Sequence, residues 1–291
     1  MRKHFTKSIH SVVIKIGTSV LTKSGRFDKK ILARLSADLA RILKKGIRVY
    51  IVSSGAIGSG MTILNLKTRP KTMQALQAAA AVGQRYLMQC YEEAFSKHGF
   101  STAQVLLTWD DLARAKRFVN AKRTLRQIQK WGLVPIINEN DTVATDEIRF
   151  GDNDRLSSLL SILVEADVLV ILSDTDGLYE GAALGKSRHR IKIVQEMADS
   201  VFSHVRDNRS SFTVGGMRSK LSAIRMSVNA GIPVFLANGR QARVLTRIFN
   251  GEDIGTLFVP KVGRGQAKKN WIKYFTGHVR PPLKLSPGSV K

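Results

Sequence analysis

The sequence contains one cysteine, Cys90, and no uninterrupted apolar stretch long enough to span a bilayer. A single cysteine excludes an internal disulfide and therefore the small disulfide-stapled class of secreted proteins. The missing apolar stretch excludes an integral protein with membrane-spanning helices. The amino-terminal segment is basic, but Lys15 interrupts the apolar run that follows it, which makes a poor signal peptide. We therefore expect a cytoplasmic protein.

Acidic residues are also scarce, with 22 Asp and Glu against 47 Lys and Arg, so the net charge is +25. Eleven of the acidic residues fall between 139 and 180, whereas residues 260–291 contain eight basic residues and no acidic one. A chain this basic attracts polyanions at low salt. However, the basic residues are spread over the whole length and no nucleic-acid-binding motif occurs. We therefore favour a solvated basic surface and do not expect nucleic acid as a partner.

The 291 residues, 43% of them hydrophobic, are enough for a large core. Apolar runs predict strands at 12–17, 48–52, 102–107, 134–137, 168–172 and 232–237. Apolar residues at helical spacing predict helices at 29–44, 72–95, 114–131, 156–163 and 217–230. This alternation predicts an α/β fold in which a mostly parallel central sheet has helices on both faces.

Small or acidic polar residues follow four of the predicted strands, at 17–19, 53–60, 138–141 and 173–177. In parallel sheets, ligands bind beyond the carboxyl ends of the strands. Glycines in such turns let backbone N–H groups approach an anion, and the helices that follow add a positive dipole end. These turns suit phosphate. The two standard nucleotide motifs, the P-loop and the dinucleotide fingerprint, are missing, so a phosphate site must have another design.

Two lysines stand close to this predicted site. Lys15 lies inside an apolar strand, where an ammonium is costly unless it meets an anion or reaches the surface. Lys220 falls at the start of a predicted helix, where the helix dipole disfavours a positive charge unless an anion is near. For each lysine, the alternative interpretation is an ordinary surface residue whose charge lies in solvent. Their positions nevertheless favour a shared anionic ligand.

The sequence leaves open which ligand the acidic cluster binds. It could hold Mg²⁺ through phosphate oxygens, or it could bind the amino group of a substrate. The candidates are Asp141, Asp152, Asp154 and Asp174. No spacing of His or Cys typical of zinc occurs, and no motif of a serine hydrolase. Lysines, small-residue turns and carboxylates together fit phosphoryl transfer, in which the protein mainly positions reactants and neutralises charge. The residues alone therefore predict a kinase-like α/β protein with an undefined substrate.

Six segments, taken in chain order, resemble the glutamate 5-kinases of the amino acid kinase superfamily. They lie at 13–22, 52–58, 80–84, 136–145, 150–154 and 215–220. Asn-Glu-Asn-Asp at 138–141, paired with Gly-Asp-Asn-Asp at 151–154, is the most specific feature, because acetylglutamate kinases, aspartokinases and uridylate kinases lack that pair in this form. The resemblance implies ATP-dependent phosphorylation of the γ-carboxylate of L-glutamate, with Mg²⁺, as the first step of proline biosynthesis. It also implies a homo-oligomer, a dimer or tetramer, and proline as a feedback inhibitor.

The resemblance also implies roles for individual residues. Lys15 and Lys220 would stabilise the transferred phosphoryl group, with Asp154 organising both lysines and Asp152 close by. The residues implied to hold glutamate are Ser54, Asp141 and Asn153. Those implied to hold ATP are Lys15, Ser173, Asp174, Val214, Gly215, Gly216, Met217, Arg218, Ser219 and Lys220. A carboxylate nucleophile is already ionised at neutral pH, so the reaction needs no general base.

The sequence departs from the family pattern in two places. Thr213 and Val214 stand where the family has Gly-Thr, which removes one glycine, and one hydroxyl at position 214, from the nucleotide loop. We expect an amino acid kinase domain over 1–260 and a basic tail over 261–291, a remnant of the lead-in to a PUA domain. Two alternatives remain: a sister kinase acting on acetylglutamate, aspartate or UMP, and a nucleic-acid-binding protein on a decayed kinase scaffold.

Overall fold

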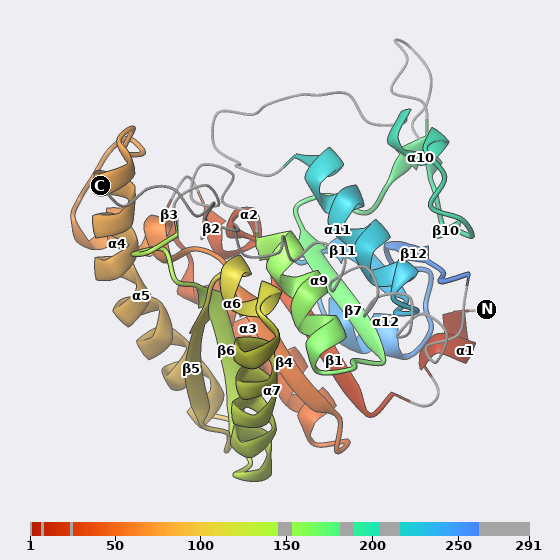
Figure 1. The fold of residues 1–291 in the computed structure, drawn as a ribbon, viewed down its shortest axis with the longest axis horizontal. Helices are drawn as coiled ribbons and strands as arrows, with labels where there is room; N and C mark the ends of the chain where they lie inside the picture. Colours follow the sequence, from red (N-terminus) through yellow and green to blue (C-terminus); the bar gives the residue numbers. More distant parts are fainter. Residues whose placement is uncertain are drawn as a thin grey trace, which may run out of the picture.

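The computed structural model describes residues 2–6, 9–23, 26–144, 153–180, 189–203 and 216–261. A twisted central sheet is flanked by helices on both faces, and the two ends of the strands define two opposite edges of the molecule (Figure 1). This arrangement confirms the predicted α/β fold.

Eight strands form the central sheet, in the spatial order β10-β12-β11-β7-β1-β4-β6-β5. All neighbours pair in parallel except β11 and β12, which are antiparallel. The strands of this sheet are β1 (Ser11–Ile16), β4 (Arg48–Ser53), β5 (Thr102–Leu107), β6 (Val134–Glu139), β7 (Val168–Ser173), β10 (Ile193–Val194), β11 (Val234–Asn238) and β12 (Thr256–Phe258). Two small ribbons pair β2 (Thr22–Lys23) with β3 (Arg26–Phe27) and β8 (Tyr179–Glu180) with β9 (His189–Arg190).

The helices divide between the two faces of the sheet. The first face carries α2 (Thr18–Leu21), α3 (Lys29–Leu43), α4 (Ala56–Ile63), α5 (Met73–Ser96) and α12 (Val244–Phe249). The second carries α6 (Trp109–Ala113), α7 (Ala115–Lys130), α9 (Asn153–Leu163) and α11 (Met217–Asn229). Two short helices complete the described chain, α1 (Arg2–Thr6) and α10 (Ser200–Ser203).

Side chains along the central strand β1 alternate between the hydrophobic cores on the two faces of the sheet. Val12, Ile14 and Ile16 belong to the core beneath α3 and α5, whereas Val13 belongs to the core beneath α9 and α11. Successive side chains on a strand point to opposite faces, so Lys15 shares the face of Val13. The lysine is therefore directed towards α9 and α11.

All six predicted strands and all five predicted helices occur, with boundaries that shift by a few residues. One predicted turn is wrong in part, because residues 56–63 form helix α4. Its glycines disfavour a helix by propensity. Tertiary packing overrides that propensity, since α4 and α5 cross with their backbones in contact at Gly60 and Gly83.

The contact between α4 and α5 leaves no room for a side chain at Gly83. A Cβ atom built there would lie 1.9 Å from the carbonyl oxygen of Ala56 and 2.2 Å from the backbone nitrogen of Gly60. Backbone atoms cannot rotate away, so the two helices would have to separate. We expect Gly83→Ala to lower the free energy of unfolding by about 3 kcal/mol, the upper end of overpacking costs, measured by urea denaturation.

Gly58→Ala on α4 is the matched control. Its Cβ would lie at an ordinary 3.5 Å from Cγ2 of Thr22, and alanine favours a helix by about 1 kcal/mol over glycine. We expect this variant to be at least as stable as the parent. Equal destabilisation by the two substitutions would contradict the close-packing argument.

Candidate active site

Three charged side chains from three elements meet on the second face of the sheet, at the carboxyl end of β1. Nζ of Lys15 lies 2.5 Å from Oδ1 of Asp154, and Nζ of Lys220 lies 3.1 Å from Oδ2 of the same carboxylate. We call these residues the Lys–Asp–Lys cluster. Asp154 stands in the first turn of α9 and Lys220 in the first turn of α11.

The Lys–Asp–Lys cluster is largely removed from water. The side chain of Asp154 is 0% exposed, that of Lys15 5% and that of Lys220 13%. Burying an ammonium is costly unless a counter-charge meets it, and Asp154 supplies one negative charge to two ammonium groups. The dipole of α9 favours the carboxylate at its amino end. The cluster therefore carries a net charge of +1 at the edge where ligands of parallel sheets bind, and an anion would complete it.

The turn after β1 leaves space beside Lys15. A Cβ atom built on Gly17 would lie 3.7 Å from Nζ of Lys15 and 3.2 Å from the carbonyl oxygen of Leu172. The backbone N–H of Gly17 already donates to that same carbonyl at 3.1 Å. A glycine at this position therefore keeps the approach to the ammonium group open.

Asn153 joins two of the strand-end segments, 53–60 and 138–141. Its buried side-chain amide lies 2.8 Å from the carbonyl oxygen of Ser53, 2.8 Å from Oδ1 of Asn138 and 3.2 Å from Oγ of Ser54. The structure thus brings Asn153 and Ser54 together, one residue from the Lys–Asp–Lys cluster. Asn138 was not singled out from the sequence, although it belongs to the Asn-Glu-Asn-Asp segment.

Gln84 on α5 is a second residue that the sequence reasoning missed. Its Oε1 accepts a hydrogen bond from Nδ2 of Asn138 at 2.8 Å. Its own amide nitrogen is buried and has no hydrogen-bond partner among the residues that the structure describes. A buried donor without an acceptor is costly. This donor therefore marks a place where a ligand oxygen would be stabilised, and Gln84 ends the 80–84 segment that carried the family resemblance.

Asp141 lies just beyond β6, in a partly enclosed position. Burial raises the pKa of its carboxyl to about 6, and the positive charge of Arg69 partly offsets this effect. Burial in turn lowers the pKa of Arg69, and Asp141 opposes that shift. A carboxylate that is incompletely neutralised by its surroundings is a good acceptor for an ammonium group of a ligand. Arg69, in the connection between α4 and α5, was not predicted from the sequence.

Ser173 and Asp174 stand at the carboxyl end of β7, where Oγ of Ser173 donates to Oδ1 of Asp174 at 3.1 Å. Ser173 is buried, and Asp174 is exposed. The neighbouring Asp176 ties this turn to the segment after β11, because it accepts hydrogen bonds from Asn238 at 3.0 Å and Gln241 at 2.7 Å. These bonds lower the pKa of Asp176, so its ionised form holds the two turns together.

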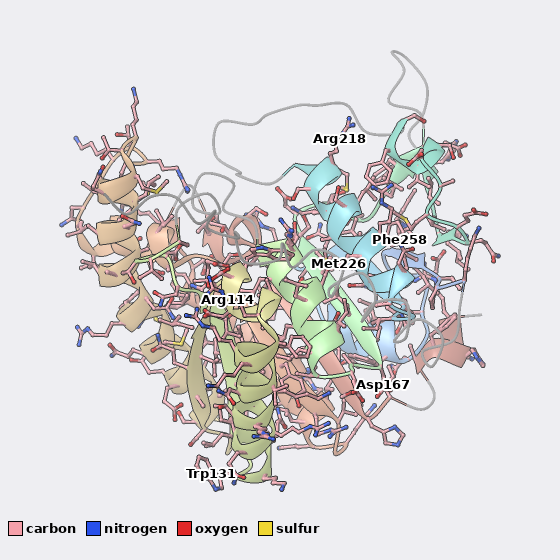
Figure 2. All side chains as sticks on the ribbon, viewed as in Figure 1. Arg114, Trp131, Asp167, Arg218, Met226 and Phe258 are labelled. Atoms are coloured by element: carbon pink, nitrogen blue, oxygen red, sulfur yellow. The ribbon has the colours of Figure 1, made fainter. Side chains whose placement is uncertain are left out.

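Other predicted nucleotide contacts begin α11. Gly216 precedes the helix as its N-cap residue, and Met217, Arg218 and Ser219 form the start of its first turn with Lys220. Figure 2 shows Arg218 at the end of α11 that lies on the carboxyl edge of the sheet. Asp152, Val214 and Gly215 lie outside the described residues, as does the altered position Thr213.

A divalent cation has no preformed carboxylate cage in the described part of the chain. Among those residues, no three His, Cys, Asp or Glu side chains gather in a metal-ligating arrangement. Mg²⁺ generally keeps several waters and binds through one or two carboxylates together with substrate phosphates. The exposed Asp174 at the carboxyl edge fits that requirement, with phosphate oxygens supplying the remaining ligands.

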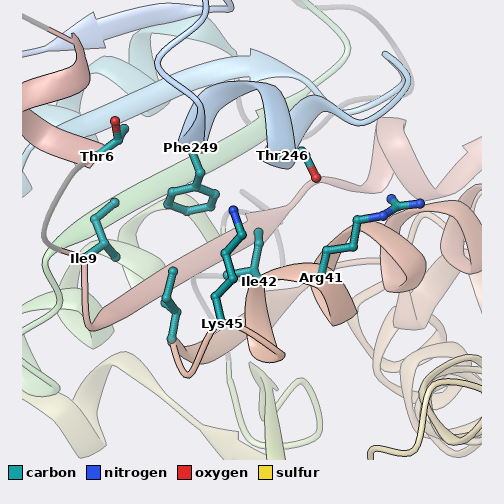
Figure 3. Close-up of a pocket in the computed structure, with 8 residues that line it drawn as sticks. Thr6, Ile9, Arg41, Ile42, Lys45, Thr246 and Phe249 are labelled. Carbon is teal, nitrogen blue, oxygen red and sulfur yellow. The ribbon is translucent and has the colours of Figure 1, made fainter.

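A pocket of about 370 Å³ lies away from this site, where α3 ends and β4 begins (Figure 3). It is lined by Thr6, Ile9, Arg41, Ile42, Lys45, Ile47, Thr246 and Phe249. Among the residues that the structure describes, no acidic side chain lines this pocket, and it shares no residue with the Lys–Asp–Lys cluster. In the described helices, we find none that is both long and apolar enough to cross a membrane.

Comparison with known proteins identifies the family of the chain. The pattern of the amino acid kinase family matches residues 11–238. A protein named glutamate 5-kinase from Thermoanaerobacter sp. is 43% identical over 282 residues, which are 96% of this chain and 76% of that protein. A glutamate 5-kinase from Chromohalobacter salexigens is 44% identical over 281 residues, 96% of this chain and 74% of that protein.

The same fold occurs in a solved structure of UMP kinase from Bacillus anthracis. It superposes with a TM-score of 0.58 at 18% sequence identity and covers 87% of this chain and 97% of the other. The likeness confirms the predicted arrangement of sheet and helices. With the family match and the identities above, it establishes that the chain belongs to the amino acid kinase family, with glutamate 5-kinases among its relatives.

Proposed function

We propose that this protein transfers the γ-phosphoryl group of ATP to the γ-carboxylate of L-glutamate, the first step of proline biosynthesis. The observation that carries the proposal is the buried Lys–Asp–Lys cluster, with its net positive charge at the carboxyl edge of the sheet. The choice of glutamate as acceptor is supported by relatives named glutamate 5-kinase, which are 43% to 44% identical over 96% of the chain.

In the proposed reaction, a γ-carboxylate oxygen of glutamate attacks the γ-phosphorus of ATP. The bond between that phosphorus and the bridging oxygen of ADP breaks, and the electron pair leaves with ADP. The products are γ-glutamyl phosphate and ADP, and no proton needs to be removed from the nucleophile. General-base chemistry is therefore unnecessary.

The two lysines of the cluster supply the charge that the transfer requires. Phosphoryl transfer spreads negative charge over the equatorial oxygens of the moving group and the leaving oxygen. Lys15 and Lys220 reach this region from different elements, so one can face the donor side while the other faces the transferred group. Asp154 holds both ammonium groups in place, which removes the cost of reorganising them during the reaction.

Glutamate would be held on the side of β4 and β6. Ser54 and the amides of Asn153 and Gln84 offer hydrogen-bonding groups near the cluster. Asp141 offers a carboxylate to the substrate ammonium group. Because Arg69 shares that carboxylate, it would tune the strength of this contact without facing the transferred phosphoryl group.

ATP would be held on the other side of the cluster. The proposed contacts are the turn at Ser173 and Asp174, fixed by Asp176, and the first turn of α11 from Gly216 to Lys220. Mg²⁺ bound with ATP would neutralise phosphate charge and orient the phosphate chain. The role of the protein is then to place the two substrates in line across the Lys–Asp–Lys cluster.

The raised pKa of Asp141 predicts a pH-dependent KM for glutamate. With its pKa near 6, Asp141 is mostly ionised at pH 8 and mostly protonated at pH 5. Only the ionised form attracts the substrate ammonium group, so KM should rise as the pH falls through about 6, while kcat changes less. Initial rates with varied glutamate at pH values from 5 to 8 measure this effect.

Two substitutions test whether Asp141 causes this pH dependence. Asp141→Asn should raise KM roughly tenfold or more at neutral pH and flatten the pH profile, because no ionisable group remains. Arg69→Leu removes the charge that lowers the pKa of Asp141, so the rise in KM should begin at a higher pH. An unchanged profile in both variants would contradict the assignment of Asp141 to the ammonium group.

The proposed reaction is tested by trapping the acyl phosphate with hydroxylamine in the presence of ATP and Mg²⁺. Formation of hydroxamate only with L-glutamate supports the proposal. Acetylglutamate and aspartate, which also carry carboxylate acceptors, are compared in the same assay, and UMP is compared by ADP release. A preference for one of these acceptors identifies a sister kinase instead, and turnover with none of them contradicts the kinase proposal.

We further propose, from the resemblance, a cytoplasmic dimer or tetramer that is inhibited by proline. The single cysteine, Cys90, is buried and free, as suits a reducing compartment. The proposed kinase domain spans 1–260 and the proposed tail 261–291. Sedimentation at several protein concentrations tests the assembly, and titration of the glutamate-dependent rate with proline tests the inhibition.

A further inference from the structure

Helix α7 carries six basic residues and no acidic residue over its 16 positions. Two of these are paired, Arg117 with Asp111 and Lys122 with Glu165, each at 2.7 Å. The other four are exposed and form no ion pair within the described ranges: Lys116, Arg123, Arg126 and Lys130. The apolar face of α7 is meanwhile buried through Leu125 and Ile128. The helix therefore presents unneutralised positive charge to solvent.

The carboxyl-terminal part of α7 lies beside the start of β4. Nε2 of Gln129 donates to the carbonyl oxygen of Val49 at 2.8 Å, which fixes this contact. Burial raises the pKa of the neighbouring Tyr50, and the charges of Arg48 and Arg126 both oppose that rise. Arg48 is thus close to the cations of α7, although it stands 78 positions from Arg126 in the chain.

The turn between α3 and β4 extends this positive charge. Lys44 and Lys45 are exposed, stand only a few residues before Arg48 and have no ion-pair partner in the part of the chain that the structure describes. Lys45 also lines the pocket of Figure 3, together with Arg41. We define the amino-end surface by seven residues, which are Lys44, Lys45, Arg48, Arg123, Arg126, Lys130 and Trp131.

Nearby acidic side chains do not neutralise the amino-end surface. Glu165 is engaged by Lys122. Asp167 accepts hydrogen bonds from the backbone N–H groups of His10 and Ser11, at 2.7 Å and 2.8 Å. These two described acids therefore have partners of their own, and the six cations keep their charge available for a ligand.

Trp131 stands directly after α7 and is 68% exposed, the highest value among the exposed large hydrophobic residues of the described chain. Figure 2 places Trp131 at the end of the molecule opposite Arg218, which marks the edge of the Lys–Asp–Lys cluster. An exposed indole beside a row of cations offers a stacking surface next to charge.

We propose that the amino-end surface binds single-stranded nucleic acid, with its cations on the phosphates and Trp131 stacked against a base. Charge complementarity supports a polyanion as the ligand, because six cations that have no ion-pair partner among the described residues gather at one edge. A membrane fits less well, because the apolar side of α7 is packed into the core and leaves Trp131 as the main group for insertion. This surface is separate from the proposed kinase site, so binding would add to the catalytic function.

The test uses the full chain and a fluorescein-labelled 20-nucleotide oligouridylate, with anisotropy measured between 50 and 300 mM KCl. If the six cations each neutralise one phosphate, the slope of log K against log[KCl] should be about −4. Changing Arg123, Arg126 and Lys130 together to glutamine should bring the slope to about −2 and weaken binding at least tenfold at 100 mM KCl. These positions are exposed on a helix, and glutamine is a good helix former, so folding should be retained.

The matched control changes Lys29, Lys30 and Arg34 of α3 to glutamine, which removes the same charge from exposed positions near the other edge. This control should keep nearly all of the affinity, and Trp131→Ala should lose roughly fivefold or more. Neither the α7 triple variant nor Trp131→Ala should change the kinase rate, so failure of this proposal is distinct from failure of the kinase assignment.

Three results would overturn the proposal. One is an equal loss of affinity in the α3 and α7 triple variants, which would mean that only total charge matters. The second is wild-type affinity for the oligouridylate in both the α7 triple variant and Trp131→Ala. The third is binding to vesicles of phosphatidylglycerol and phosphatidylcholine without binding to the oligonucleotide, which would identify a membrane surface instead.

Discussion

Lys220→Met is expected to lower kcat about 100- to 1,000-fold, the usual cost of removing one preorganised group that stabilises transition-state charge. Methionine keeps the length of the side chain but cannot neutralise the transferred phosphoryl group. The KM for glutamate should change much less, because Lys220 acts on the moving charge rather than on the amino acid. Steady-state rates with both substrates varied separate the two effects.

Arg225→Met is the control for this substitution, since Arg225 lies farther along the same helix. Among the described residues, its ion pair is with the exposed Asp199 at 3.1 Å, and its guanidinium lies over the ring of Phe202. Loss of such an exposed pair costs little. We expect near-normal kcat in this variant. A kcat for Lys220→Met equal to that of the parent would contradict the proposed role of Lys220.

Asp154→Asn should lower both the free energy of unfolding and kcat. The amide cannot neutralise Lys15 and Lys220, so two ammonium groups are left near each other without their shared counter-charge. Breaking a buried ion pair typically costs about 3–5 kcal/mol, so the free energy of unfolding should fall by that order. The lysines should also lose their positions, which lowers kcat at least about 100-fold.

Urea denaturation and steady-state kinetics measure the two effects of Asp154→Asn separately. Asp199→Asn serves as the control, because the side chain of Asp199 is 98% exposed and its pair with Arg225 faces solvent. We expect both the free energy of unfolding and kcat to fall in the Asp154 variant, and neither to change much in the control. A fully stable and fully active Asp154→Asn protein would contradict this expectation.

The sequence predicted the sheet because its strands are buried on both faces. The all-apolar run of β7 and the repeated alternation with amphipathic helices leave few other arrangements. Strand β12 was not predicted, because it is only three residues long and pairs with β11 in the opposite direction. Helix α4 was not predicted either, because the glycines that make residues 53–60 resemble a loop serve instead to let two helix backbones touch.

Some residues of the candidate site were predictable from the sequence, and others were not. Lys15 was recognisable because a charge interrupts an apolar strand, and the structure gives it Asp154 as a partner. Gln84 and Arg69 were not recognisable as site residues, because polar side chains are common on helices and in connecting segments. Only their neighbours in the folded structure identify them. Their positions depend on how α4 and α5 pack against the sheet, which no local pattern contains.

The clustering of basic residues on the surface was also not predictable from the sequence. Lys and Arg are spread along the chain, and this spread favoured an unspecialised solvated surface. The fold brings Arg48 beside α7 and leaves Arg48 and four of the six basic residues of α7 without an ion pair within the described residues. Clustering of charge in space is therefore decided by the parallel sheet topology rather than by local composition.

In the proposed reaction, a carboxylate oxygen of glutamate attacks the γ-phosphorus of ATP across the Lys–Asp–Lys cluster. Glutamate labelled with ¹⁸O in its γ-carboxylate tests this step directly. After turnover, hydroxylamine cleaves the acyl phosphate at carbon and releases phosphate that keeps the bridging oxygen. We predict phosphate with one ¹⁸O atom, detected by its ³¹P chemical shift. Unlabelled phosphate would show attack by water instead, and would contradict the account.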